Sequence, residues 1–280
     1  MLKPVTSLPM SVVAVAAAGL LLQACEGEPE PAAATQAPPG AAAPAPLESV
    51  TPDPPLDRAA LLDAVARAAS AWSAGSETTG ADPLVRRSFD VSLPFGCHGA
   101  EEPPAEGVGD GTARWSWSPD RKTIGLDLTP GDWTRSALIA GAGPAPWEAV
   151  EGFWISRPWM TADGCPSVQA DPLAGAPAAA SPETVGLAAV FEEDGSRLGR
   201  RNGRAFSFTV RGDGEAPALA PENGYRVRLQ GRIASFPDGR AIRCRASSPR
   251  QRPVCVAAVQ LDRVAFQTAS GETLSEWRPG

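Results

Sequence analysis

The sequence is poor in the residues that most catalytic and metal sites require. His98 is its one histidine, so no multi-histidine metal site can form. No Cys-x-x-Cys pair offers a zinc site, and neither a Gly-x-Ser-x-Gly elbow nor a Gly-Lys-Ser/Thr phosphate loop occurs. His98 follows Cys97, and neighbours on a strand point to opposite faces, so the two do not form a thiol–imidazole pair. We therefore expect no metal or other cofactor, and the absence of a catalytic motif favours a non-enzymatic role.

Long apolar runs are also absent, except near the start of the chain. Residues 10–22 are apolar apart from Ser11 and Gly19, and Lys3 precedes them. This run is shorter than the roughly 20 residues that a membrane-spanning helix needs. Its length and its basic flank are typical of a secretory signal peptide. We predict that residues 1–24 are a signal peptide that is removed on export.

The run ends in Leu22-Gln23-Ala24-Cys25. This tetrapeptide resembles the lipobox of bacterial lipoproteins, although glutamine is a less usual residue at its second position. The resemblance implies cleavage before Cys25 and attachment of diacylglyceryl and acyl chains such as palmitate to that cysteine. It thus implies a membrane-anchored protein of the cell envelope that faces the periplasm. The residue after the cysteine is Glu26 rather than aspartate, which in the enteric pattern favours the outer membrane over the inner.

Large apolar side chains are missing from the segment that follows. Between Cys25 and Leu47 there is no large apolar residue, and alanine, proline and glutamate dominate. Such a composition cannot bury enough surface to offset the entropy of ordering. We predict that residues 25–55 form a disordered tether, stiffened by proline to about 3.1 Å per residue where it is extended.

Four cysteines remain besides Cys25: Cys97, Cys165, Cys244 and Cys255. An even number in an exported protein predicts two disulfides. Three pairings are open. We favour Cys97–Cys165 and Cys244–Cys255, because the alanine- and proline-rich residues 172–182 separate the two couples. Those residues have no periodicity and indicate a linker or long surface loop.

One amphipathic helix is expected at the start of the folded body. Apolar residues recur at helical spacing between residues 61 and 72, Asp53 could cap the start, and Gly75 suits the end. Beyond it the apolar period changes to two. The predicted strands are residues 89–95, 113–117, 124–128, 147–155, 185–191, 205–211, 225–233, 241–245, 254–261 and 263–268.

This pattern predicts a mainly β protein of antiparallel sandwich or small-barrel type. Residues 56–171 would form a helix plus a β-rich domain and residues 183–280 a second β-rich domain, although one large domain remains open. Strand 225–233 is expected to turn through Pro237, Asp238 and Gly239 into strand 241–245. The last region could form a five-stranded barrel of the oligonucleotide/oligosaccharide-binding type.

Two groups of residues hint at binding. Tryptophans gather between residues 115 and 159, and we expect most of them in the core. Arginines gather in two turns, at Arg197, Arg200, Arg201 and Arg204, and at Arg240, Arg243, Arg245, Arg250 and Arg252. They could meet anionic lipid, lipopolysaccharide phosphate or cell-wall polymer, but a solvated rim is the simpler interpretation.

The leading hypothesis is a non-enzymatic envelope lipoprotein that binds or scaffolds another envelope component. Its partners would be the membrane, through the lipid anchor, and an envelope protein, glycan or lipopolysaccharide; nucleic acid is not expected outside the cytoplasm. The alternative is an envelope hydrolase that uses a pair of carboxylates on cell-wall or glycan material. The sequence gives no reason to choose any particular pair.

Overall fold

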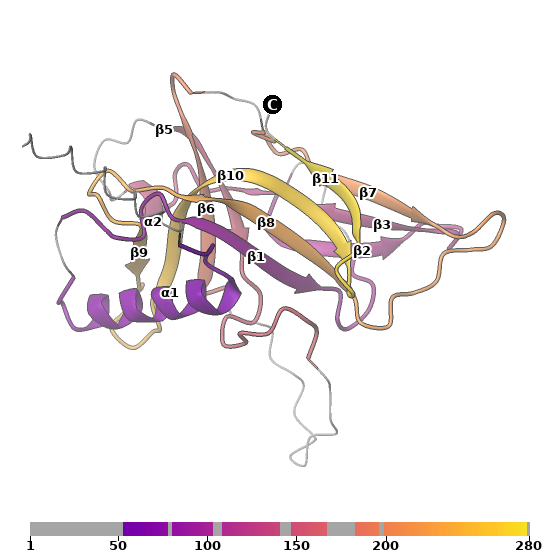
Figure 1. Cartoon of the computed structure of the whole chain (residues 1–280), viewed down its shortest axis with the longest axis horizontal. Helices are drawn as coiled ribbons and strands as arrows, with labels where there is room; N and C mark the ends of the chain where they lie inside the picture. The colour runs from indigo at the N-terminus through magenta and orange to yellow at the C-terminus, as the bar shows by residue number, and fades with distance from the viewer. Residues whose placement is uncertain are drawn as a thin grey trace, which may run out of the picture. The chain divides into compact units, whose positions relative to one another are not determined.

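Figure 1 shows the computed structural model of the chain, which describes residues 53–77, 80–102, 108–140, 147–166, 183–195 and 199–278. Cys25, the predicted signal peptide, nearly all of the predicted tether and residues 172–182 lie outside the described residues. The helices are α1 (Arg58–Ser73) and α2 (Ala137–Ala140). The strands are β1 (Ser88–Phe95), β2 (Ala113–Trp117), β3 (Thr123–Leu128), β4 (Gly131–Asp132), β5 (Trp147–Trp154), β6 (Val185–Glu192), β7 (Phe206–Arg211), β8 (Tyr225–Ile233), β9 (Ile242–Arg245), β10 (Val254–Thr268) and β11 (Thr273–Trp277).

The larger of the two sheets is organised around the long strand β10, which Figure 1 shows in its middle. The strand order is β1-β8-β10-β6-β5-β4, and β9 and β11 also pair with β10. Val259 pairs with Ile233 of β8 on one edge and with Ala189 of β6 on the other. Along the first edge β9 comes before β8, and along the second edge β11 follows β6. Among the named strands of this sheet, within the described residues, only β6 and β10 pair in parallel.

The smaller sheet has the order β2-β3-β7 and packs on one face of the larger one. Strands β2 and β3, both predicted from their alternation, pair as an antiparallel hairpin with Trp115 opposite Leu126. The buried residues of this sheet share one apolar core with Val227 and Phe266 of the larger sheet. We call this the inner face of the larger sheet. The mainly β, two-sheet architecture confirms the predicted fold class.

Helix α1 adds to the same core, through Leu61, Leu62 and Val65, and contacts β9, β10 and β1. The helix ends at Ser73, and Gly75, with φ of 63°, lies just beyond the capping residue Ala74, in agreement with the sequence prediction. The start of the helix does not agree: the capping residue is Asp57, whose carboxylate accepts the Ala60 N–H at 2.8 Å, and not Asp53.

The reason for the later start is a short strand-like contact before α1. The N–H of Leu56 donates to the Ser88 carbonyl at 2.9 Å, and the Leu56 carbonyl accepts from Asp90 at 2.9 Å. This parallel bridge to β1 keeps the backbone extended through residue 56. The helix can therefore begin only after it.

Both favoured disulfides are present in the structure. Cys97 is bonded to Cys165, and Cys244 to Cys255, which lies directly opposite it in the β9–β10 ladder. Disulfides persist in oxidising compartments outside the cytoplasm. The structure thus supports an extracytoplasmic location.

The two regions predicted to be separate domains share one sheet. Strand β1 pairs with β8, and β5 pairs with β6, so strands from residues 56–171 flank the central strands β8, β10 and β6 from residues 183–280 on both sides. All described residues belong to one compact unit that spans residues 51–280.

Three predictions about the last region are wrong. Strand β9 pairs with β10 instead of with β8, because the turn at residues 237–239 carries the chain along the edge of β10. Strands 254–261 and 263–268 are one strand, β10, interrupted by a bulge at Asp262. The region forms no barrel of its own, since β7 joins the smaller sheet and β8 to β11 join the larger.

The outer face of the larger sheet is divided into two halves. Over β5, β6 and the first part of β10, a second apolar cluster of Val150, Val190, Val256, Ala258, Phe236 and Ile139 is buried under α2 and neighbouring loops. We call this the covered half. Over β1, β8, the second part of β10 and β11, most outward positions are polar, with the buried Pro94 and Ala265 as exceptions, and we call this the open half.

Candidate functional site: a notch beside strand β10

A gap in strand pairing occurs where the two neighbours on one edge of β10 meet. On this edge β6 pairs with β10 as far as Val259, and β11 begins at Val264. Within the described part of the chain, residues 260–263 have no ladder partner on this edge, although Gln260, Leu261 and Arg263 pair with β8 on the other. The bulge at Asp262 falls in the same place. We call this gap the β10 notch.

The notch opens into a hollow of about 350 Å³ with an apolar floor and a charged rim. Phe206 and Val264, both buried, and the half-buried Trp277 supply apolar surface, and the Trp277 ring meets Phe206 edge-on at 5.3 Å. Guanidinium groups on the rim outnumber carboxylates. They belong to Arg201, Arg232, Arg263 and Arg278, against Glu192 and Asp262.

Arg201 joins the apolar and the charged parts of the notch. Its guanidinium carbon lies 4.7 Å from the centre of the Phe206 ring, a cation–π distance. Its side chain also donates to the Ala205 carbonyl at 2.5 Å. Burial, with the nearby positive charge of Arg204, lowers the pKa of Arg201. A cation held against an aromatic ring and partly removed from water gains most from an anionic partner.

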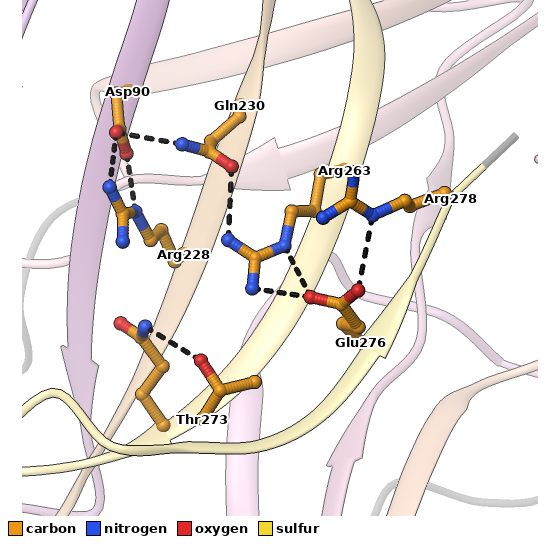
Figure 2. Close-up of polar contacts among 8 residues, drawn as sticks. Asp90, Arg228, Gln230, Arg263, Thr273, Glu276 and Arg278 are labelled. Carbon is orange, nitrogen blue, oxygen red and sulfur yellow. Dashed lines mark hydrogen bonds and ion pairs between the residues drawn. The ribbon is translucent and has the colours of Figure 1, made fainter.

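A chain of polar side chains across the open half positions Arg263, as Figure 2 shows. The Arg263 Nε donates to Glu276 at 2.7 Å, and a second nitrogen donates to the Gln230 carbonyl oxygen at 3.1 Å. The Gln230 amide donates to Asp90 at 2.8 Å. Asp90 also accepts from the Arg228 Nε at 2.7 Å. We call this chain the polar ladder; it connects β1, β8, β10 and β11.

The charges of the polar ladder stabilise one another. Hydrogen bonds from Arg228 lower the pKa of Asp90 despite its partial burial, and the bond to Asp90 raises the pKa of Arg228. Hydrogen bonds from Arg263 and Arg278 lower the pKa of Glu276. Because Glu276 and Gln230 both hold Arg263, we assign it the role of fixing the wall of the notch. Arg232 and Arg278, which are exposed, are better placed to meet a ligand.

A second polar site lies at the far edge of the same sheet. Asp132 of β4 stands directly opposite Glu151 of β5, and both line a hollow of about 500 Å³. Glu151 is buried and accepts the N–H groups of Arg201 and Asn202 at 2.8 Å each. Burial raises the pKa of Glu151, whereas hydrogen bonds from Thr134 lower the pKa of Asp132. The two residues are thus register partners whose carboxyl pKa values are shifted in opposite directions.

The tryptophans of the sequence hint mostly belong to the core. Trp115 is buried, and Trp117, Trp133 and Trp147 pack against the apolar clusters. Trp154 lies against Trp133 with ring centres 4.6 Å apart, so only Trp159, which is 57% exposed, stands out into solvent among the six. The aromatic residue at the notch is Trp277, which lies outside the cluster that the sequence emphasised.

The two arginine-rich turns of the sequence make different contacts. Arg201 of the first turn reaches the notch, while Arg197 lies outside the described residues. In the second turn, Arg245 donates to the carbonyl of Ala137 at 2.6 Å and Arg240 pairs with Glu77, so these two side chains hold neighbouring segments. Sequence reasoning missed Arg232, Arg263 and Arg278. The alternation of polar residues on β8 was the available signal for Arg232.

His98 is exposed, and no group of side chains suited to a metal occurs among the residues that could be described. None of the helices in the described ranges is long and apolar enough to cross a membrane. No protein-family model matches this chain, and no curated protein or solved structure matches it.

Proposed function

We propose that this protein is a non-enzymatic lipoprotein of the cell envelope, anchored through Cys25, which binds an anionic, partly apolar ligand in the β10 notch. The observation that carries the proposal is the excess of guanidinium groups around the aromatic floor of a hollow of about 350 Å³. Arginine forms charge-assisted hydrogen bonds with carboxylate and phosphate, and an apolar floor favours a ligand with a hydrophobic part. The fixed position of Arg263 supports a preformed site.

The location is supported by the two disulfides, and the anchor rests on the lipobox resemblance. Two or three acyl chains on Cys25 would hold the protein stably, because each buried CH₂ contributes about 0.8 kcal/mol. The outer membrane is favoured by Glu26. Replacing Cys25 by Ser should move the protein from the membrane fraction to the soluble periplasmic fraction. Retention in the membrane fraction would show that the anchor lies elsewhere.

Calorimetric titration with decanoate tests binding at the notch, with decanol as the neutral control of equal chain length. We expect decanoate to bind the wild-type protein more tightly than decanol does. The double variant Arg201→Gln/Arg278→Gln should lose about tenfold or more in affinity, since each charge-assisted hydrogen bond contributes roughly 1.5–3 kcal/mol. The matched control is Arg250→Gln/Arg252→Gln, two exposed arginines of the β9–β10 loop that should bind as the wild type does. Equal affinity in both double variants would refute a role for the notch.

A carboxylate-pair hydrolase is the second candidate, and the opposed pKa shifts of Asp132 and Glu151 favour it. A protonated acid next to an ionised carboxylate is the arrangement of glycoside hydrolases. Turnover of purified cell-wall glycan by the wild type, abolished in both Asp132→Asn and Glu151→Gln, would replace the binding proposal. Absence of turnover would leave Glu151 with its visible role of fixing the backbone at residues 201 and 202.

A further inference from the structure

We infer that the β10 notch binds the free C-terminus of an extended peptide, whose backbone pairs with residues 260–263 and whose last side chain is apolar. This inference rests on the proposed function and names the class of its ligand. It combines three features of the notch: an unpaired length of strand, an apolar floor and an arginine-rich rim.

The first feature is the backbone of β10 itself. Within the described ranges, β6 pairs with one edge of β10 up to Val259 and β11 pairs with the same edge from Val264, and on that edge no strand pairs with the four residues between them. Four residues of strand span about 13 Å, at roughly 3.3 Å per residue. Backbone N–H and C=O groups on an open strand edge are a template for an added strand. A peptide of three or four residues would fill this gap and continue the sheet between β6 and β11.

The second feature is the floor. The buried Phe206 and the half-buried Trp277 lie edge to face, and Leu261 adds a half-buried side chain at the bulge. Side chains of a strand alternate between the two faces of its sheet. One side chain near the end of an added strand would therefore point to this floor while its neighbours point outward. An aromatic or large aliphatic residue suits the apolar surface and the limited volume.

The third feature is the charge at the rim. Arg232 and Arg278 are 59% and 65% exposed, and each contacts a single carboxylate, Asp262 and Glu276 respectively, among the ion pairs of the described residues. With Arg201 and Arg263 they make four guanidinium groups against the three carboxylates of Glu192, Asp262 and Glu276, which leaves an excess of one positive charge. The carboxylate of a peptide C-terminus would neutralise this excess. An acyl chain could supply the charge and the apolar group, but it could not use the backbone of residues 260–263.

Fluorescence anisotropy with a labelled pentapeptide, Ser-Thr-Val-Thr-Phe, tests the inference in three forms. The forms are the free acid, the C-terminal amide, and the free acid with N-methylation of its central amide. We expect the free acid to bind the full chain best, and each altered form to bind about tenfold more weakly, because one loses the charged group and the other a strand hydrogen bond.

The same variants separate this inference from the proposed function. Binding of the free acid should fall about tenfold in Arg201→Gln/Arg278→Gln and stay unchanged in Arg250→Gln/Arg252→Gln. Equal binding of acid, amide and N-methylated peptides would overturn the inference, as would no peptide binding at all. If decanoate still binds in an arginine-dependent way while the peptide does not, the inference fails and the proposed function stands. If neither ligand binds, both fail.

Discussion

The covered half and the open half of the larger sheet both include part of strand β10, but their outward side chains differ: they are apolar in the covered half and mostly polar in the open half. In the covered half, outward residues of β10 such as Val256 and Ala258 are fully buried beneath Phe236, Ile139 and their neighbours. In the open half, the outward Arg263 and Gln267 of the same strand hydrogen-bond to polar side chains, Arg263 to Glu276 and the buried Gln267 to Thr273.

The difference shows how one sheet can be both core and surface. An apolar outward face must be covered to be stable, and here α2 and the loop around Phe236 cover it. A polar face whose charges satisfy one another can stay in contact with water. The bulge at Asp262 lies between the covered half and the open half. At the same place one edge of β10 has no partner strand, which forms the notch.

The largest expected effect comes from uncovering the covered half. Phe236 is 1% exposed and packs edge-on against Trp147, with ring centres 5.6 Å apart. Phe236→Ala should lower the free energy of unfolding by about 3–5 kcal/mol, through lost burial and a residual cavity. Urea denaturation measures it. A loss below about 1 kcal/mol would mean that this cluster is not part of the cooperative core.

The next largest loss of stability is expected from removing the disulfide at the start of β10. Replacing Cys244 and Cys255 together by Ser removes a disulfide that closes a loop of sequence separation 11. Loop entropy alone predicts a loss of about 3 kcal/mol in the free energy of unfolding. The variant, compared with the wild type by thermal unfolding, should still retain the polar ladder. An unchanged melting temperature would show that β9 is held by its hydrogen bonds and by α1 instead.

A smaller effect is expected in the open half. Asp90→Asn removes the ion pair with Arg228, both partners of which are partly exposed. We expect a loss of about 1 kcal/mol or less in the free energy of unfolding, as for other surface ion pairs. Denaturation in urea with and without 1 M salt measures it, because salt should weaken the wild type more than the variant. A loss in the free energy of unfolding as large as that of Phe236→Ala would show that the open half contributes as much to stability as the covered half does.

The pH dependence of stability should separate the two kinds of carboxyl group. The pKa of Asp90 is lowered in the folded state, so its contribution is present above its unfolded pKa and is lost as the pH falls through the folded value, below about pH 4. The pKa of Glu151 is raised, so its effect is opposite: stability is lost as the pH rises through the folded value.

Urea denaturation between pH 3 and pH 8 checks this sign. Asp90→Asn should flatten the acid side of the profile, and Glu151→Gln should flatten the loss on the alkaline side of about pH 4.5. The same slopes in both variants as in the wild type would contradict the assigned shifts.

Several elements of the fold could be predicted from local patterns. The alternation at residues 225–233 gave β8 with its observed bounds, since one face of that strand is buried and the other is polar. Residues 254–268 were predicted as two strands because the bulge breaks the period at Asp262. Strand β11 was missed, because Thr273–Trp277 is half-exposed and has no clear apolar alternation.

The sequence by itself determined what depends on neighbouring residues. This includes the signal-like start, the mainly β class, most strand positions and the number of cysteines available for disulfides. The tertiary structure decided what depends on residues far apart in the chain. It placed Asp90 beside Arg228 and Gln230, brought Arg201 to Trp277, and stopped β6 and β11 on either side of the notch. Strand order and packing set these contacts, because the local pattern specifies which face a side chain takes but not which strand lies next to it.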